Sequence, residues 1–317
     1  MLGAVIGDIV GSPYEFVNEY ARRKIKPFEP TIRGKCKFTD DTAMTLALAN
    51  VLCKHPNTSD EERLGEKIAQ SYIDYYNNYP LEVAGVSSCY GNGFARWAEA
   101  GDIHVKRKAM TNGGAMRISP VGWLYDTLEE TKRVAKIATE RTHDSKKAIE
   151  AAQMIAAAIY MVRRTKDKDI IKRYAERVYG YQILTGEDGL NVYREKSKKY
   201  RMEKISHFKL KEIINCDAKL SVEEALFAFL NTDNFKDCIV TAVAIGGDSD
   251  TIACMAGGIA EAYYGIPGDW KEKAMKVLWE CHCHSEDIEM IVTFDRYISP
   301  VTENWKEELK EIMGGKI

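Results

Sequence analysis

Two short acidic motifs each place two carboxylates and a threonine hydroxyl at the predicted start of a helix. They are Phe38-Thr-Asp-Asp-Thr42 and Ile245-Gly-Gly-Asp-Ser-Asp-Thr251. One oxygen-bearing side chain is enough to cap a helix N-terminus, and the helix dipole offers only about half a unit of positive charge there. Four carboxylates therefore exceed what capping requires. They are Asp40, Asp41, Asp248 and Asp250.

Divalent cations would compensate this negative charge if the two helix starts face each other. Mg²⁺ and similar ions prefer carboxylate and hydroxyl oxygens, and Thr39 and Thr251 add neutral oxygens. A two-metal site is therefore one hypothesis, and ordinary helix capping is its alternative. A third interpretation makes Asp248 the nucleophile of an aspartate-phosphorylating hydrolase. That chemistry needs a strand before the aspartate, and the sequence offers few strands.

Two glycine-containing stretches have the freedom to approach an anion or a sugar. Residues 111–120 read Thr-Asn-Gly-Gly-Ala-Met-Arg-Ile-Ser-Pro, so backbone N–H groups can turn toward an anion while Arg117 offers a charged fork. In Tyr90-Gly-Asn-Gly-Phe94 the flanking aromatic rings suit the wall of a sugar site. The first stretch matches neither a Walker loop nor a dinucleotide-binding motif. A turn that leads into a helix is the alternative for both.

Histidines occur in two further motifs. His143 stands just before a predicted helix for which Asp144 or Ser145 is a natural cap, so it is either structural or a ligand contact, to a phosphate or a ring. The run Cys281-His-Cys-His284 resembles a metal cluster. Four consecutive residues cannot easily close one tetrahedral shell, so we do not expect structural zinc there.

Helices must position these groups, because apolar residues recur with a helical period along most of the chain. The predicted helices span residues 42–52, 62–76, 129–141, 146–163, 222–230, 235–245, 249–264 and 270–281. Alternation typical of strands is scarce. The sequence therefore predicts an all-α fold in which residues 1–317 form a single domain, a multi-helix bundle around a shared core.

Two regions outside the motifs have a distinct character. Gly3, Gly7 and Gly11 recur every four residues, which predicts a helix face that another helix or a ligand approaches closely. Residues 166–219 are highly charged, with a predicted turn at 186–189 and a basic strip at 194–204. We expect this peripheral segment to be a solvated face.

Composition excludes several classes of protein. The 317 residues include 45 basic and 47 acidic side chains, for a net charge of -2, so no general nucleic-acid binding is expected. The N-terminal residues lack a basic leader, and the longest mainly apolar run, 154–162, is too short to cross a membrane. The eight cysteines are expected to be reduced thiols in a cytoplasmic protein. The sequence leaves the oligomeric state open.

Taken in order, these stretches resemble the ADP-ribosylglycohydrolase family. The resemblance begins with residues 3–16, Gly-Ala-Val-Ile-Gly-Asp-Ile-Val-Gly-Ser-Pro-Tyr-Glu-Phe, and continues through residues 38–42, 90–94, 112–117, 142–143, 224–230 and 246–251. It implies an all-α fold with two Mg²⁺ or Mn²⁺ ions. The implied reaction is hydrolysis of the glycosidic bond at C1 of the terminal ribose of an ADP-ribosyl adduct. An ADP-ribosylated protein or small molecule would be the substrate, and ADP-ribose a product.

The same resemblance assigns roles to individual residues. The implied metal ligands are Thr39, Asp40, Asp41, Asp248, Asp250 and Thr251. The implied catalytic residues are Glu15, Asp41 and Asp248, with Glu15 positioning metal or activating water. The implied ADP-ribose contacts are Tyr90, Gly91, Gly93, Asn112, Gly113, Gly114, Met116, Arg117 and His143.

One departure and two alternatives accompany the resemblance. The family often follows Thr-His with a second His and a Pro, where this chain has Asp144 and Ser145. The protein could instead be a module that binds ADP-ribose without cleaving it, or another two-metal hydrolase that acts on phosphoesters. The intact acidic motifs and Glu15 argue for activity and make the non-catalytic module the weaker alternative.

Overall fold

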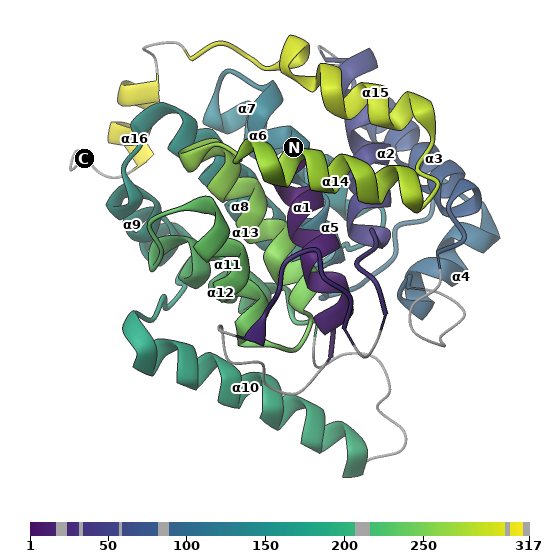
Figure 1. Cartoon of the computed structure of the whole chain (residues 1–317). Coiled ribbons are helices and arrows are strands. Elements are labelled where there is room, and N and C mark those ends of the chain that lie inside the picture. Colours follow the sequence, from purple (N-terminus) through teal and green to yellow (C-terminus); the bar gives the residue numbers. More distant parts are fainter. Residues whose placement is uncertain are drawn as a thin grey trace.

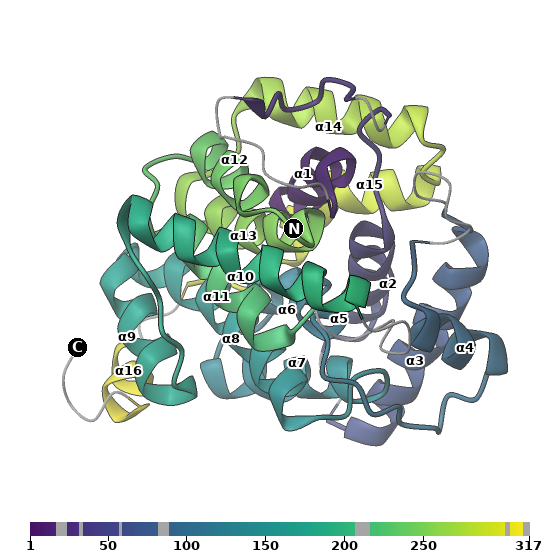
Figure 2. The same cartoon turned by 90° about the horizontal axis from the view of Figure 1, so that it is seen from below.

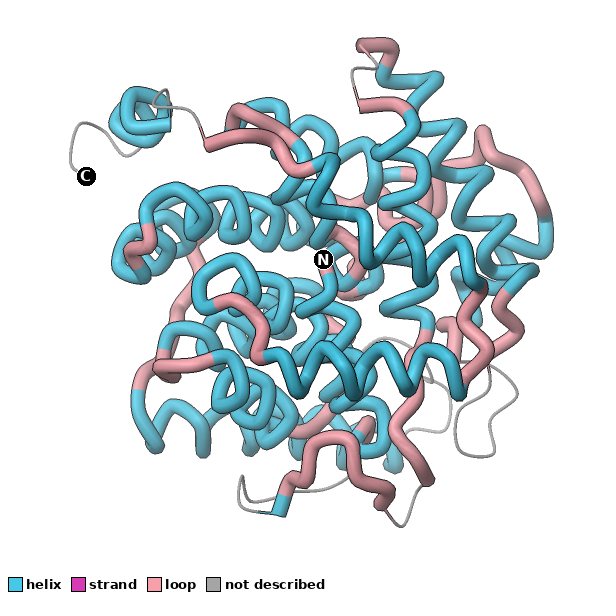
Figure 3. Tube along the Cα trace, turned by 45° about the horizontal axis from the view of Figure 1, so that its top comes forward, coloured by secondary structure: helices cyan, strands magenta, loops and turns pink. Residues whose placement is uncertain are grey.

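Every range with apolar helical periodicity is helical, to within one residue, in the computed structural model. The structure describes residues 1–16, 24–31, 34–56, 59–81, 89–206, 216–301 and 305–312. Helices and loops make up this part of the chain, without a strand (Figure 3). The prediction of an all-α fold is confirmed.

The α-helices occur in the following order along the described residues: α1 (Leu2–Gly11), α2 (Asp40–Lys54), α3 (Glu61–Asn78), α4 (Asn92–Ala100), α5 (Gly113–Met116), α6 (Ser119–Leu124), α7 (Leu128–Glu140), α8 (Lys146–Thr165), α9 (Lys168–Tyr179), α10 (Gly186–Ser206), α11 (Ala218–Leu230), α12 (Phe235–Ile245), α13 (Ser249–Tyr264), α14 (Gly268–Glu280), α15 (Ser285–Thr293) and α16 (Trp305–Ile312). Two 3₁₀ turns are also described, η1 (Ser12–Tyr14) and η3 (Phe294–Tyr297).

Helix α1 lies inside the helix array, and its main partner is α13 (Figure 1). The contact runs along the glycine face that the sequence predicts to be closely approached. A methyl group on Gly7 would overlap the backbone of Ala253, and one on Gly11 would overlap the backbone of Asp250. The two backbones therefore touch, and the residues at the start of α13 are held against the end of α1.

The other helices build the core around this pair. Helix α8 packs against α5, α6, α7, α11 and α13, and the residues that it buries are mainly alanine, isoleucine and methionine. Helix α2 packs against α3 and α6, while α14 lies against α1. None of the eight cysteines forms a disulfide in the structure.

The charged segment contains two helices, α9 and α10, that bury apolar side chains, which the sequence analysis did not predict. Helix α9 buries Ile171 and Tyr174, and α10 buries Leu190 and Tyr193. The predicted turn at 186–189 is wrong, because these residues form the first turn of α10. The acidic residues of that turn, Glu187 and Asp188, interact favourably with the positive end of the helix dipole. Their charge therefore favours the start of a helix, although in the sequence it is equally compatible with a loop.

The basic strip is partly anchored to the bundle. Arg194 is half-buried, and its Nε donates a hydrogen bond to the carbonyl of Ala244, 2.9 Å away in the last turn of α12. Glu195 and Lys196 are exposed, as expected of a solvated face. The side chains of residues 197–206 lie outside the described ones. Figures 1 and 2 place α10 on the outside of the helix array.

Candidate functional site

The start of α2 is capped from α1 rather than by its own carboxylates. Asp8 accepts hydrogen bonds from the backbone N–H groups of Thr39 (2.9 Å) and Thr42 (3.1 Å). It also accepts from the hydroxyls of Thr39 (2.8 Å) and Thr42 (2.5 Å). Asp8 and the hydroxyl of Thr39, which accepts from the N–H of Asp41, together cap this helix end, so the carboxylates of Asp40 and Asp41 are not needed for capping.

The start of α13 follows a glycine turn that only glycine adopts easily. Gly246 and Gly247 have φ angles of 83° and 72°. The carbonyl of Gly247 accepts a hydrogen bond of 2.6 Å from the N–H of Phe16, which fixes the neighbouring Glu15 beside the turn. Asp248 occupies the N-cap position but makes no side-chain cap bond. Its carboxylate is therefore turned away from its own helix.

The two helix starts face each other. The hydroxyl of Thr251 donates a hydrogen bond of 3.1 Å to Asp41 Oδ2, which joins the second acidic motif to the first. Carboxylate oxygens of Asp8, Asp41 and Asp250 lie within 4.8 Å of one another, and so do those of Glu15, Asp248 and Asp250. Asp250 belongs to both groups. The facing arrangement that the two-metal hypothesis requires is present in the structure.

The pKa values of three of these carboxyl groups are raised. Burial raises the pKa of Asp41 well above its usual range, with the charge of Asp8 as the next cause. Burial and then the charge of Glu15 raise the pKa of Asp250 in the same direction. Burial also raises the pKa of Asp40 to about 7, and Arg117 offsets part of this effect. In each case burial and neighbouring carboxylates disfavour the ionised form, so ionisation of the cluster would need additional positive charge.

One buried atom points to a missing positive partner. Oδ1 of Asp41 has no hydrogen-bond partner among the described residues, although this side chain is buried. An unpaired buried carboxylate oxygen is costly, and a cation would satisfy it. The surrounding donors are carboxylate and hydroxyl oxygens, which are the ligands of Mg²⁺ and Mn²⁺. The residues present therefore fit hard divalent cations.

The stretch 112–117, called the glycine loop below, contains the short helix α5 and adjoins the carboxylates. Asn112 donates from Nδ2 to Asp248 Oδ2 (2.8 Å) and to the hydroxyl of Ser221 (3.1 Å). Both of its glycines are closely packed. A methyl group on Gly113 would lie 2.7 Å from Nε2 of His143. A methyl group on Gly114 would overlap the side chain of Thr139. The glycine loop therefore contacts the acidic cluster through Asn112 and packs against His143 at Gly113.

Arg117 is a buried cation at the end of this loop. Its Nε donates to the carbonyl of Gly113, and its guanidinium lies over the rings of Tyr72 (4.7 Å) and Phe94 (5.2 Å). Its Nη1 has no hydrogen-bond partner among the described residues. Met116 is buried beside it, and the Met116 carbonyl lies 3.3 Å from the thiol of Cys254. The guanidinium can therefore offer an N–H group to an anion.

His143 is neutral and fixed by two threonines. Its Nδ1 lies 2.8 Å from the hydroxyl of Thr142, and its Nε2 lies 3.1 Å from the hydroxyl of Thr111. Burial, Arg117 and Arg107 lower its pKa well below the usual range. Of the two caps predicted for the next helix, Asp144 and Ser145, it is Ser145 that caps α8. Its hydroxyl accepts a hydrogen bond from the N–H of Ala148. A neutral imidazole can offer a hydrogen bond but no charge.

The aromatic loop, residues 90–93, directly precedes Phe94, the ring that contacts Arg117. The ring of Tyr90 stacks on that of Phe94 with a centroid distance of 5.8 Å, and its hydroxyl donates to the carbonyl of Tyr79. Gly91 is the N-cap of α4, and a methyl group there would meet nothing within 4 Å. Gly93, in contrast, packs directly against the guanidinium of Arg107.

Asp8, Ser221 and Arg107 join this arrangement although the sequence analysis did not select them. Asp8 had a readable signal, since it is an acidic residue in an otherwise apolar helix between Gly7 and Gly11. Ser221 and Arg107 carry no local signal, because they reach the site only through the fold. Residues 235–245 form α12, a helix, so the strand that an aspartate nucleophile motif needs does not precede Asp248 in the described residues.

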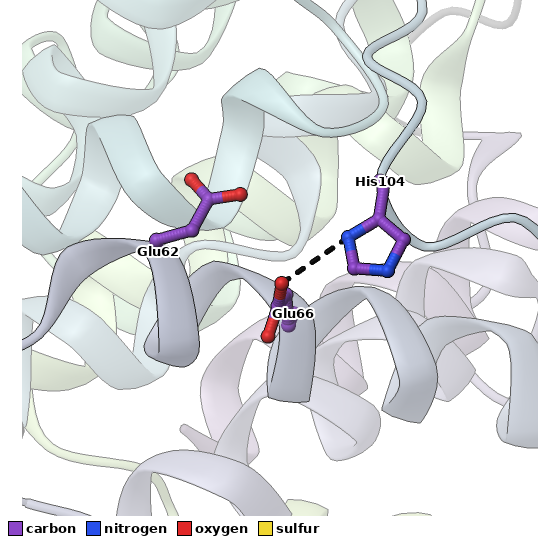
Figure 4. Close-up of side chains that lie close together, drawn as sticks. All are labelled: Glu62, Glu66 and His104. Carbon is purple, nitrogen blue, oxygen red and sulfur yellow. Dashed lines mark ion pairs between the residues drawn. The ribbon is translucent and has the colours of Figure 1, made fainter.

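A second group of possible metal-binding side chains lies on the surface. Glu62, Glu66 and His104 come within 4.8 Å of one another (Figure 4). Here each carboxylate already has a side-chain partner, since Glu62 pairs with Arg141 at 2.7 Å and Glu66 lies 3.2 Å from Nδ1 of His104. This group therefore lacks the charge imbalance of the buried carboxylates.

Comparison with known proteins gives a consistent result. A model of the ADP-ribosylglycohydrolase family matches residues 1–298. ADP-ribosylhydrolase ARH3 of Mus musculus is 24% identical over 323 residues, which covers 86% of this chain and 85% of that protein. ADP-ribosylarginine hydrolase Tri1 of Pseudomonas putida is 25% identical over 317 residues, with coverage of 89% and 74%.

A solved structure has the same fold. It is described as an ADP-ribosylglycohydrolase-related protein complex, and it matches with a TM-score of 0.65 at 21% identity over 93% of this chain and 95% of that chain. In the described residues, none of the helices has the length and apolar character needed to cross a membrane.

Proposed function

Because this chain belongs to the ADP-ribosylglycohydrolase family, we propose that it cleaves the glycosidic bond at C1 of the terminal ribose of an ADP-ribosyl adduct with the aid of two divalent cations. Water is the second reactant, and ADP-ribose and the free acceptor are the products. The observation that carries the metal dependence is the pair of carboxylate groups sharing Asp250, with an unpaired oxygen on Asp41.

The proposed ligand set divides between the two helix starts. Asp40, Asp41 and Thr39 come from the start of α2, and Asp248, Asp250 and Thr251 from the start of α13. When bound, Mg²⁺ or Mn²⁺ supplies positive charge that orients ribose hydroxyls and stabilises negative charge. The hydroxyl of Thr39 donates to Asp8 at 2.8 Å and accepts from the N–H of Asp41 at 3.4 Å, which leaves one oxygen lone pair of Thr39 for a cation.

Glu15 is the proposed general base. It is half-buried, whereas Asp248 and Asp250 beside it are buried, so Glu15 is the member of this group that can exchange a proton with solvent. Its backbone is held by the Phe16–Gly247 hydrogen bond. A base fixed beside the reacting carbon accepts the proton from the attacking water.

The glycine loop and the aromatic loop are proposed to hold the rest of ADP-ribose. The Nη1 group of Arg117 has a hydrogen bond to donate, which suits a diphosphate oxygen. Asn112 joins the glycine loop to Asp248, so binding there would fix the ribose relative to the acidic cluster. Contacts far from the reacting bond can in this way contribute to the rate.

The test is a panel of ADP-ribosylated acceptors incubated with Mg²⁺, Mn²⁺ or a chelator. ADP-ribosylarginine belongs in the panel because a relative is named for it. We expect free ADP-ribose from at least one acceptor, only with metal present. Binding without release would indicate a non-catalytic module, and release of nucleoside monophosphate would indicate a phosphoester hydrolase.

A double variant tests the residues. Asp40→Asn with Asp248→Asn should abolish turnover, because it removes a ligand from each helix start. Asp269→Asn is the matched control, since Asp269 is an exposed carboxylate paired with Lys236. Full activity in a folded double variant would refute the metal mechanism. We also propose that residues 1–317 form one domain and that the protein is cytoplasmic, the latter supported by its free thiols.

A further inference from the structure

Arg107 lies where the two predicted substrate loops meet the Thr142-His143 motif. Its Nη1 donates a hydrogen bond of 2.9 Å to the carbonyl of Thr142. Its backbone is fixed on both sides, because its N–H donates to the carbonyl of Arg141 and its carbonyl accepts from the N–H of Asp144, each at 2.9 Å. Both the backbone and the side chain of Arg107 are therefore held against residues 141–144.

The guanidinium of Arg107 also packs against the aromatic loop at Gly93. An ideal Cβ atom at Gly93 would lie 2.8 Å from Cζ and 2.9 Å from Nε of Arg107, which is closer than side chains pack. Gly91, two residues earlier, has nothing within 4 Å of the same position. The space that a side chain at residue 93 would need is therefore occupied by the guanidinium of Arg107.

The contacts continue from Arg107 to the glycine loop. Thr142, whose carbonyl Arg107 holds, also contacts Nδ1 of His143, and Nε2 of His143 lies against Gly113. The order of contacts is thus Gly93, Arg107, Thr142, His143 and Gly113. These residues connect the aromatic loop with the glycine loop through one guanidinium group.

We propose that Arg107 is a positioning residue that sets the distance between the aromatic loop and the glycine loop, and that residue 93 is glycine in order to admit its guanidinium. The inference rests on the proposed function, in which these two loops hold ADP-ribose. A lysine would retain the charge but lack the planar group that packs on Gly93 while bonding to Thr142. The proposal therefore assigns the role to shape as well as charge.

Gly93→Ala is a mild way to break this arrangement. The atoms that the new methyl group meets belong to the end of a flexible side chain, so Arg107 can move aside without a shift of backbone. We expect normal folding with a displaced guanidinium. Misplacement of a binding loop by a few tenths of an ångström to about 1 Å weakens binding, and we expect the Kd for ADP-ribose to rise about tenfold.

A double-variant cycle tests the coupling by calorimetric titration of ADP-ribose into the metal-loaded protein. Arg107→Ala and Gly93→Ala should each raise Kd about tenfold, and together also about tenfold instead of about a hundredfold, because both remove one contact. Arg107→Lys should resemble Arg107→Ala. In turnover, KM should rise while kcat changes little, and melting temperatures should stay close to that of the wild type.

Two further variants serve as matched comparisons. Lys108→Ala removes an exposed basic residue next to Arg107 and should leave Kd unchanged. Gly91→Ala adds a methyl group in open space in the same loop, and its effect should be additive with that of Arg107→Ala.

The outcomes separate this inference from the proposed function. A wild-type protein that does not bind ADP-ribose would overturn the proposed function and this inference with it. Wild-type binding with additive effects of Gly93→Ala and Arg107→Ala would overturn the inference alone. Full restoration by Arg107→Lys would likewise overturn it, since charge without the planar fork would then suffice.

Discussion

Asp40→Asn should stabilise the metal-free protein at pH 8, although it removes a proposed metal ligand. Burial and the charge of Asp8 raise the pKa of Asp40 from 3.8 to about 7. At pH 8 the folded protein must therefore hold an ionised carboxylate in surroundings that favour the protonated form. Asparagine has nearly the same shape and no charge, so it removes this cost.

The magnitude follows from the difference between the two pKa values. At about 1.4 kcal/mol for each pKa unit, a carboxyl group with a pKa near 7 instead of 3.8 costs about 4 kcal/mol to ionise in the folded state. Asp40 is half-buried, so water screens part of this cost, and we expect a gain of about 1–2 kcal/mol. For a chain of this size that corresponds to a rise of roughly 2–6 °C in melting temperature.

The sign depends on pH in a defined way. Below about pH 4 the carboxyl is protonated in both the folded and the unfolded state, so the variant gains nothing. Between about pH 4 and pH 7 the unfolded state ionises first, and the advantage of Asp40→Asn grows as the pH rises. It is complete at pH 8. Saturating Mg²⁺ should reverse the order, because bound cations stabilise the ionised carboxylate.

The assay is thermal unfolding by circular dichroism at pH 5 and pH 8, with chelator and then with Mg²⁺. Asp269→Asn is the control, because it removes an exposed carboxylate outside the acidic cluster. A melting temperature of Asp40→Asn at or below that of the wild type, at pH 8 with chelator, would refute the electrostatic reasoning. An unchanged order in Mg²⁺ would count against Asp40 as a ligand.

Four further variants test other parts of the structure. Gly7→Ala should lower the free energy of unfolding by about 1–3 kcal/mol and weaken Mg²⁺ binding, because the methyl group forces α1 away from α13. A urea melt measures the first effect and a metal titration the second. Tyr79→Phe should cost about 2–3 kcal/mol, since it removes a 2.6 Å hydrogen bond to the buried Asp287, and an unchanged urea midpoint would contradict this. Asp250→Asn should weaken both proposed cation sites, whereas Glu15→Gln should weaken one; calorimetric Mg²⁺ stoichiometry distinguishes them, and equal losses would argue against the shared role of Asp250.

Local sequence signals predicted the helices and the two acidic helix starts well. The apolar period locates α2 and α13, and the excess of carboxylates at their starts is visible without a fold. The spacing of Gly3, Gly7 and Gly11 predicted a close approach, which is the contact of α1 with α13. These features succeed because each depends on residues within a few helical turns.

Other features depend on contacts across the fold. Arg107 reaches Gly93 and Thr142 only after separate segments pack together, so no spacing in the sequence indicates its position. The turn predicted at 186–189 fails for a different reason. Glycine and acidic residues suit both a loop and the first turn of a helix, and burial of Leu190 and Tyr193 decides between them.

The contact between α1 and α13 also constrains how this protein can change in evolution. Along this face backbone atoms touch backbone atoms, so the separation of Asp8 from Asp250 is set by main-chain geometry and not by side-chain rotamers. A substitution cannot widen or narrow the acidic cluster gradually, because any added atom at Gly7 or Gly11 displaces a whole helix. New acceptor preferences would therefore have to arise in the surrounding loops, while the acidic cluster is inherited as a unit.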